Sequence, residues 1–375
     1  MIEAIMTNAK VVTLTPKIPL VDGTMEMDKL IEVILSTKRC HNSTGELNFV
    51  AWLYKYLETL KVKATPLAEG AIVVEVGVGG KTLFSCHLDT VHSNSESDGS
   101  LQTVFYDGSF GHIFCGDKKT TCLGADDGAG IYILLKMIEA GVKGTYIFHR
   151  GEEKGAISAH AIKSKHVDFL KKFNACIAFD RPGTDEVIII QGGSECASKE
   201  YGNSLAVALS KQGLTYQTST KGVFTDSKVY RSIIPECINI GVGYYDQHTN
   251  GEYQDWGHLI TLTNVVCAVD WDALKPKRVP VPEPVWNPTK GGQYKGYYES
   301  EYEVRPKTKA AVFAKPSIPV EDLEGELDID FETMSMTDID DYTGDAEMTK
   351  GIMRLVVELD AERGRVSRLQ MLLGM

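Results

Sequence analysis

Residues 124–130 read Gly-Ala-Asp-Asp-Gly-Ala-Gly, and residues 131–138 follow directly as Ile-Tyr-Ile-Leu-Leu-Lys-Met-Ile. The second run is mostly apolar and predicts a buried helix. The small residues before it allow the backbone to approach closely whatever the two carboxylates hold. Taken alone, the stretch fits equally well a loop in which an aspartate caps the following helix. The choice between a helix cap and a binding site therefore depends on the rest of the chain.

The overall composition is that of a soluble globular protein. The 375 residues allow two or three domains, and the hydrophobic and charged fractions of 43% and 24% are ordinary. No apolar run approaches the ~20 residues of a membrane span. Residues 1–4 do not begin a secretory signal of the usual kind. Eight scattered cysteines predict reduced thiols, and we expect a cytoplasmic protein without a membrane partner.

The acidic charge of the chain is concentrated in one segment. Residues 321–347 hold twelve acidic residues and no Lys or Arg, whereas the whole chain has a net charge of −12. The remainder is therefore neutral on balance, and the acidity says nothing about what the main domain binds. No basic patch of the kind that binds nucleic acid is present, which excludes a nucleic-acid partner.

Strand-like and helix-like segments alternate over residues 25–274. This alternation predicts an α/β domain with three layers, in which helices cover both faces of a mostly parallel sheet. Residues 93–123 form a long polar excursion that predicts a surface hairpin. The expected strands are 81–87, 144–150, 174–180, 186–191 and 236–242, and the expected helices are 27–38, 43–60, 127–140, one from about 156, 199–212, one opening at 225–231, and 256–274.

After a main domain of residues 1–274, the rest of the chain divides into three further segments. Residues 275–319 are rich in Pro, Tyr and Gly, with five prolines between 275 and 288, and predict an extended linker. Residues 320–347 form the acidic segment. Residues 348–375 predict an amphipathic helix, because apolar residues recur near heptad spacing. This helix either packs on the chain's own core or mediates oligomerisation or partner binding.

Metal-ligating residue types follow the ends of successive predicted strands. In open α/β sheets, ligands gather at the carboxyl ends of the strands. Each residue alone is ordinary, but the succession predicts a metal site at this edge. A histidine ligand also needs an acceptor for its second ring nitrogen, and the residue two positions after the first histidine is suitably placed. The residues are His87, Asp89, Asp126, Glu152, Glu153, Asp180 and His248.

Four ordered motifs in this set resemble the di-zinc exopeptidase superfamily, which includes peptidase T, acetylornithine deacetylase-like enzymes and lidless aminopeptidases. They are His-Leu-Asp-Thr-Val at 87–91, the stretch 124–130, Gly-Glu-Glu at 151–153 and His248. The resemblance covers residues 25–274 and implies the phosphorylase/hydrolase-like fold of these peptidases. Some members carry a lid domain between the equivalents of Asp180 and His248. Only 67 residues intervene here, so we expect no lid.

The resemblance also implies a role for each residue of the set. Asp126 would bridge two zinc ions, for which Co²⁺ or Mn²⁺ could substitute, and the bond between Asp126 and Asp127 would be cis. One ion would take His87 and Asp180 as its other ligands, and the second would take Glu153 and His248. Two metals sharing a carboxylate activate a water between them for amide hydrolysis.

Glu152 would act as the general base in this reaction, with Asp89 supporting His87. The expected enzyme is a cytoplasmic zinc metallopeptidase, an exopeptidase acting on short peptides. An N-acyl-amino-acid deacylase uses the same chemistry and stays an alternative. So does a non-catalytic scaffold protein that kept the fold.

Specificity is less determined by the sequence. Arg181 directly follows a predicted ligand, so it either binds a substrate carboxylate or pairs with a nearby acid. Asp226 lies where lidless relatives have a Thr-Asp pair near the site. Tyr244 and Tyr245 are candidates, beside a zinc ion, for stabilising the oxyanion. An acidic pocket would favour an aminopeptidase, and a cationic pocket would favour a carboxypeptidase or deacylase.

Overall fold

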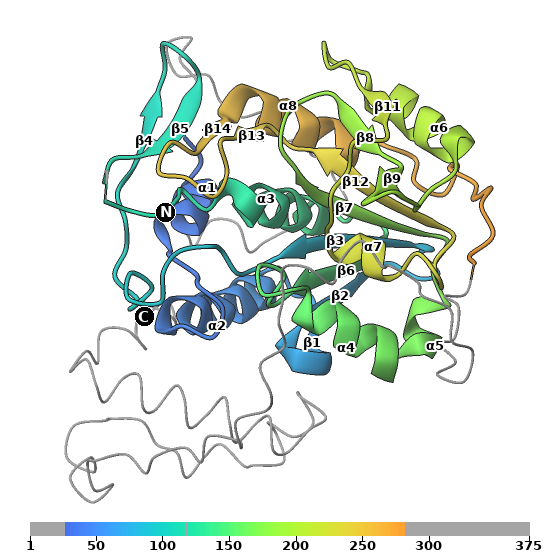
Figure 1. Ribbon diagram of the computed structural model, residues 1–375, viewed down its shortest axis with the longest axis horizontal. Coiled ribbons are helices and arrows are strands. Elements are labelled where there is room, and N and C mark those ends of the chain that lie inside the picture. Colours follow the sequence, from blue (N-terminus) through green and yellow to red (C-terminus); the bar gives the residue numbers. More distant parts are fainter. Residues whose placement is uncertain (1–26, 118, 282–375) are drawn as a thin grey trace, which may run out of the picture. The chain divides into compact units, whose positions relative to one another are not determined.

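The computed structural model describes residues 27–117 and 119–281 (Figure 1). Within them, eight strands form one sheet in the order β1-β2-β6-β3-β7-β12-β8-β11. Strands β6, β3, β7 and β12 run parallel, and so do β8 and β11. The antiparallel contacts are those of β1 with β2, β2 with β6, and β12 with β8. The predicted mixed, mostly parallel sheet is therefore confirmed. The bounds are Ala64–Pro66 (β1), Ile72–Val76 (β2), Thr82–His87 (β3), Gly144–His149 (β6), Ala175–Arg181 (β7), Glu186–Ile188 (β8), Gln217–Ser219 (β11) and Glu236–Gly241 (β12).

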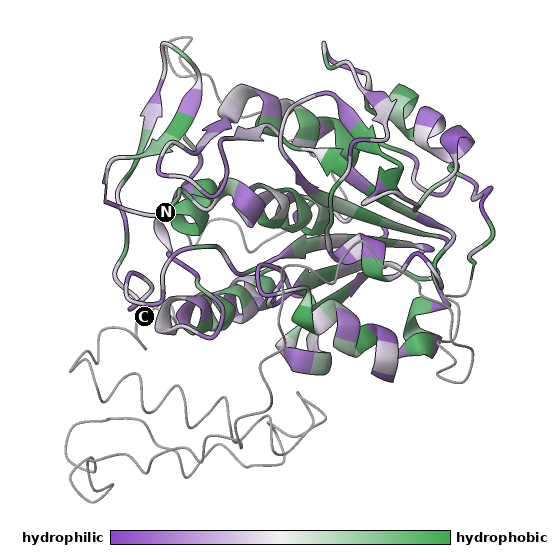
Figure 2. Cartoon of the chain, viewed as in Figure 1, coloured by the Kyte–Doolittle hydropathy of each residue, from purple (hydrophilic) through white to green (hydrophobic). Residues whose placement is uncertain are grey.

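The central strands are hydrophobic on both sides. All residues of β3, β6 and β12 are buried, as expected for parallel strands covered on both faces. Figure 2 shows the hydrophobic colour along these strands, whereas the outer helices are mixed. Because the parallel strands share a direction, their carboxyl ends meet at one edge, with His87 of β3 paired to His149 of β6.

Helices cover the two faces of the sheet and enclose two hydrophobic cores. The larger core includes residues of α1, α2, α3, α6 and α8, and the smaller core includes residues of α4, α5 and α7. The predicted start of α2 is confirmed, because the Ser43 side chain accepts a hydrogen bond from the Glu46 amide. The bounds are Lys29–Ser36 (α1), Thr44–Thr59 (α2), Ala125–Glu139 (α3), Ile157–Lys165 (α4), Val167–Leu170 (α5), Lys199–Leu209 (α6), Asp226–Val229 (α7) and Trp256–Cys267 (α8).

A second sheet of four antiparallel strands, in the order β13-β14-β5-β4, lies among the described residues. The hairpin expected in residues 93–123 is present as β4 (Val104–Asp107) and β5 (His112–Cys115). It is not isolated, because β5 pairs with β14 (Tyr253–Asp255), and β14 pairs with β13 (Tyr244–Tyr245). The sequence pattern missed this contact because the paired residues lie far apart in the chain. Two further short strands, β9 (Ile190–Gln191) and β10 (Ser194–Glu195), form a small hairpin.

The end of the main domain differs slightly from the expectation. Helix α8 ends at Cys267 rather than near 274, and residues 275–281 have no regular secondary structure. The amides of Lys277 and Arg278 donate to Glu236 Oε1 at 2.6 and 2.8 Å, so the first part of the predicted linker contacts the sheet. The predictions for residues 282–319, 320–347 and 348–375 lie outside the described residues.

Residues 181–247 contribute the strands β8 to β13 and the helices α6 and α7. Within these residues no separate lid domain is present. Across the described part of the chain, none of the helices has both the length and the apolar content needed to cross a bilayer. All eight cysteines are free thiols.

Candidate metal centre

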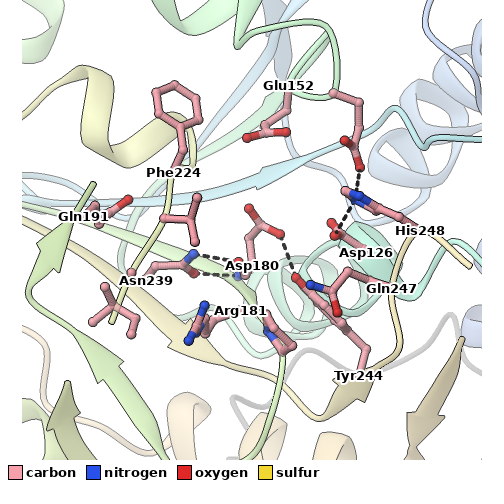
Figure 3. Close-up of a pocket in the computed structure, with 15 residues that line it drawn as sticks. Asp126, Glu152, Asp180, Arg181, Gln191, Phe224, Asn239, Tyr244, Gln247 and His248 are labelled. Carbon is pink, nitrogen blue, oxygen red and sulfur yellow. Dashed lines mark hydrogen bonds and ion pairs between the residues drawn. The ribbon is translucent and has the colours of Figure 1, made fainter. Parts of the chain in front are cut away.

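The predicted ligands come together at the carboxyl edge of the parallel strands. His87 ends β3, Asp180 lies near the end of β7, and Glu153 follows β6 in the loop after Arg150. Asp126 lies in the first turn of α3, and His248 lies in the loop between β13 and β14. Figure 3 shows Asp126, Asp180 and His248 directed toward one space.

Asp126 lies between two histidines. Its Oδ1 is 3.0 Å from His87 Nε2, and its Oδ2 is 3.2 Å from His248 Nε2. His87 Nε2 is also 3.6 Å from Asp180 Oδ1, whereas His248 Nε2 is 2.9 Å from Glu153 Oε1. The five side chains therefore form two sets of three that share Asp126.

The donor set fits metal ions in chemistry and spacing. A tetrahedral zinc site with bonds near 2.0–2.2 Å places its donor atoms roughly 3.3–3.6 Å apart. The ligand atoms of His87, Asp126 and Glu153 lie within 4.8 Å of one another, and the same holds for His87, Asp127 and Asp180. Asp127 is the less suitable aspartate, because its carboxylate accepts backbone hydrogen bonds from His87 at 3.1 Å and Gly130 at 2.9 Å.

The protonation of His87 also fits a cation at this place. His87 Nδ1 lies 2.9 Å from the Asp89 backbone carbonyl, which accepts only, so Nδ1 carries a proton. In the neutral ring, the Nε2 lone pair then faces the carboxylates of Asp126 and Asp180. Only a cation or a further proton between these groups makes that arrangement favourable.

The charges of the cluster also favour a bound cation. Burial, together with Asp126, raises the pKa of Asp180, and burial also raises the pKa of Glu153. Both pKa shifts arise first from burial, so these carboxylates are costly to keep charged without compensating positive charge nearby. Buried charges in proteins are paired or coordinate metals, and the described cluster holds more carboxylates than histidines.

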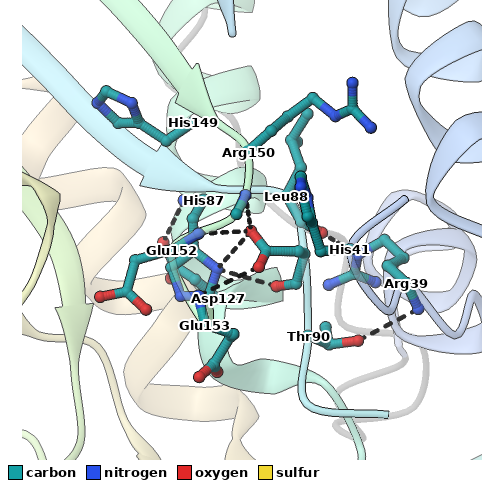
Figure 4. Close-up of polar contacts among 12 residues, drawn as sticks. Arg39, His41, His87, Leu88, Thr90, Asp127, His149, Arg150, Glu152 and Glu153 are labelled. Carbon is teal, nitrogen blue, oxygen red and sulfur yellow. Dashed lines mark hydrogen bonds and ion pairs between the residues drawn. The ribbon is translucent and has the colours of Figure 1, made fainter. Parts of the chain in front are cut away.

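Asp89 supports the site differently from the expectation. Its carboxylate, the expected acceptor of the ring proton, lies 3.8 Å from His87 Nδ1. The Asp89 backbone carbonyl accepts that proton in its place. The carboxylate accepts the amides of Gly151, Glu152 and Glu153 at 2.8, 3.0 and 3.1 Å. Asp89 therefore fixes the loop that carries the two glutamates, Glu152 and Glu153, which are labelled in Figure 4. The peptide bond between Asp126 and Asp127 is cis, as the resemblance implied.

Three further residues fix the position of Asp180, two through its carboxylate and one through its backbone. The Thr225 hydroxyl donates to Asp180 Oδ2 at 2.7 Å, and the Tyr244 hydroxyl donates to Oδ1 at 3.1 Å. The Asn239 side chain bonds both the amide and the carbonyl of Asp180, at 2.9 and 2.6 Å. Sequence reasoning missed Thr225 and Asn239 in these roles, because a hydroxyl at a helix start and an amide within a strand carry no distinctive pattern.

A cavity of ≈ 230 Å³ adjoins the cluster. Its lining includes Glu152, Arg181 and Tyr244, whereas within the described residues Asp226 and Tyr245 are not part of it. Asp226 is buried at the start of α7, and the Tyr245 hydroxyl is directed to Thr184, 3.5 Å away. These two side chains therefore lie outside this cavity, and their role toward a substrate stays a prediction.

Arg181 is already paired. Its guanidinium donates to Glu186 Oε2 from Nε at 2.9 Å and from a terminal nitrogen at 2.7 Å. Of the two readings left open by the sequence, the salt bridge is the one present. The rest of the cavity wall is largely apolar or amide, with Pro182, Ile188, Gln191, Val223, Phe224 and Gln247.

Glu252 was not among the residues predicted from the sequence. This carboxylate is 2% exposed and accepts three backbone amides of the loop that carries Asp126. Burial raises its pKa to about 7, with the Asp126 charge adding to the effect and the amide hydrogen bonds opposing it. A glutamate before a short strand normally reads as a solvated turn residue, so no local signal distinguishes it.

Comparisons with known proteins find similarity in structure alone. No protein-family model matches the chain, and no curated protein matches it. The aminopeptidase PepT of Bacillus cereus superposes with a TM-score of 0.51 over 66% of this chain and 97% of its own, at 15% identity. A tripeptidase of Staphylococcus aureus gives 0.50 over 64% and 95%, at 14% identity. The chain has the fold of these peptidases. The fold implied by the sequence resemblance is thus confirmed.

Proposed function

We propose that this protein is a metal-dependent peptidase that cleaves amide bonds at the end of short peptides, with two zinc ions and a carboxylate base. The proposal is carried by Asp126, whose two carboxylate oxygens lie 3.0 and 3.2 Å from the Nε2 atoms of His87 and His248. A carboxylate with one oxygen toward each of two ligand sets is what a two-metal hydrolase requires. The fold shared with a solved aminopeptidase and a solved tripeptidase supports this reaction class.

Each residue of the site would have a separate role in hydrolysis. Zinc ions, when bound, would supply Lewis-acid stabilisation of negative charge and lower the pKa of water. Glu152 lines the cavity and would take a proton from the attacking water and return it to the leaving amine. Burial raises the pKa of Glu152 well above its usual range, the direction that proton transfer near neutral pH needs. Tyr244 lines the same cavity, and its hydroxyl holds Asp180.

The lining of the cavity suits the amino-terminal end of a peptide better than it suits a free carboxylate. Arg181 would be the natural partner of a substrate carboxylate, but Glu186 already holds its guanidinium. Binding of a carboxylate would have to break this pair. The apolar wall of Ile188, Val223 and Phe224 suits an apolar side chain beside the scissile bond. The volume is below the ~300–1,000 Å³ of pockets for drug-sized ligands, which fits a short substrate end. An aminopeptidase or tripeptidase is therefore preferred to an amino-acid deacylase.

A metal count combined with a substrate panel tests the proposal. Purified protein is loaded with Zn²⁺, Co²⁺ or Mn²⁺, dialysed and assayed against di- and tripeptides and N-acetyl amino acids. We expect close to two zinc ions per chain and hydrolysis of peptides with a free amino terminus. Asp126→Asn is expected to lose both bound zinc and hydrolysis while it keeps the wild-type circular dichroism spectrum.

Each alternative gives a different result in the same assay. Hydrolysis of N-acetyl amino acids in preference to peptides would assign a deacylase. Wild-type protein that binds no metal and cleaves no substrate would indicate a non-catalytic scaffold. Normal hydrolysis by Asp126→Asn would show that the proposed mechanism is wrong.

A further inference from the structure

Glu252 connects two parts of the candidate centre that are remote in sequence. Its Oε2 accepts the amides of Leu123 and Gly124 at 2.7 and 2.8 Å, and its Oε1 accepts the amide of Asp126 at 2.9 Å. The carboxylate is thus shared by three amides of the loop that carries the bridging aspartate. All of these bonds are buried.

The same loop is also held from the opposite side. The Gly124 carbonyl accepts from the guanidinium of the buried Arg39 at 3.2 Å. Gly124 has a φ of 79°, and a Cβ at this position would lie 3.1 Å from Thr90 Cγ2. Its backbone therefore fits between fixed groups, with the amide bound by Glu252 and the carbonyl bound by Arg39. The orientation of the loop depends on both charged side chains.

Glu252 lies four residues after His248, in the same short connection between β13 and β14. A hydrogen bond forms a turn within this connection, because the Glu252 amide donates to the Thr249 carbonyl at 3.2 Å. One segment thus contributes a ligand of one metal set and the carboxylate that binds the backbone of Asp126. Movement of either end changes the distance between Asp126 and His248, which is now 3.2 Å between Oδ2 and Nε2.

We propose that Glu252 is a positioning residue for the metal centre, which sets the Asp126 carboxylate relative to His248 and thereby determines the affinity of the shared site for zinc. The inference rests on the proposed function, because it concerns the metal that Asp126 would bridge. Outer residues that orient metal ligands typically change metal affinity by about 10–100-fold when substituted.

Glu252→Gln is the test variant, and Glu236→Gln is its matched control. A glutamine side chain has the same shape, but its NH₂ group cannot accept the amides that one carboxylate oxygen now binds. Glu236 is likewise buried and likewise binds backbone amides, those of Ser198, Lys277 and Arg278, at the opposite ends of the strands. Loss of a buried backbone acceptor is therefore common to both variants, and only Glu252 lies next to the ligands.

The measurement is zinc affinity, by competition with a chromogenic chelator, on full-length protein freed of metal. Thermal unfolding of the metal-free protein is recorded in parallel. We expect the melting temperature to fall in both variants, because both lose buried hydrogen bonds. Zinc affinity should fall by about 10–100-fold in Glu252→Gln and stay at the wild-type value in Glu236→Gln. Glu252→Asp, which keeps the charge, should recover part of the affinity. It also serves as the test variant if the glutamine protein does not fold.

The outcomes separate the positioning role from the proposed function. Equal zinc affinity in wild type and in both Glu252 variants would overturn the positioning role alone. An equal loss of affinity in Glu236→Gln would also overturn it, since a general loss of stability would then explain the result. Wild-type protein without zinc affinity would overturn the proposed function and this inference with it.

Discussion

The ion pair between Glu46 and Arg150 should make a large and pH-dependent contribution to stability. The Glu46 side chain is fully buried, and Arg150 binds both of its oxygens, Nε to Oε1 at 3.0 Å and a terminal nitrogen to Oε2 at 2.7 Å. Burial alone would raise the pKa of Glu46, but hydrogen bonds from His41 and Arg150 outweigh it and lower the pKa to about 2. The pair joins the start of α2 to the residue before the Glu152 loop.

Two estimates of its magnitude agree. A carboxyl whose pKa falls from 4.5 to about 2 on folding contributes about 3 kcal/mol, at 1.36 kcal/mol per pH unit. Removal of one partner from a buried ion pair costs about 3–5 kcal/mol. Because the pKa is lowered by folding, this contribution is fully present above pH 4.5. It is lost as the pH falls toward 2 and Glu46 becomes protonated.

The assay is urea unfolding of wild type and Glu46→Gln, in EDTA so that metal release does not contribute. We expect Glu46→Gln to lose about 3 kcal/mol at pH 7 and the difference from wild type to shrink between pH 4.5 and 2. Glu58→Gln on the same helix is the control. Its partner Lys55 is exposed, so little change is expected at any pH. A Glu46→Gln protein as stable as wild type at pH 7, or a difference that does not shrink on acidification, would refute the reasoning.

Three other predictions follow from the site and its surroundings. Glu152→Gln should abolish peptide hydrolysis and keep the bound zinc, whereas loss of zinc in this variant would make Glu152 a ligand. Thr225→Val removes the hydroxyl that donates to Asp180 Oδ2 and should weaken zinc binding roughly 10-fold, measured by chelator competition. Truncation after Val281 should leave stability and hydrolysis unchanged. Truncation after Leu274 removes two amides bound to Glu236 and should lower the melting temperature while the site stays active.

The parts of the fold that could be predicted are those with a local pattern. β3 and β7 are largely apolar runs with a ligating residue at or next to their carboxyl ends, so both the strand and that side chain could be read from the sequence. The glycine-rich stretch at the start of α3 identified Asp126 once the other strand ends were considered. These features depend on residues close together in the chain, where periodicity and composition are informative.

The parts that could not be predicted depend on contacts between distant segments. The pairing of β5 with β14 joins residues about 140 positions apart, and no local pattern encodes it. The same holds for Glu252 and the Leu123 loop, and for Thr225 and Asp180. Asp89 was found in the sequence, but whether its carboxylate or its carbonyl meets His87 depends on the backbone path after β3.

The two histidines of the centre differ sharply in their access to water. The side chain of His87 is 1% exposed, whereas that of His248 is 48% exposed. If the proposed ions are present, the one between Glu153 and His248 exchanges with the solvent faster. The exposed His248 side chain can rotate away from that ion without opening the core. Dialysis should then remove the ions in sequence rather than together. A preparation with one zinc per chain would be a half-emptied form of the centre, with the retained ion beside His87.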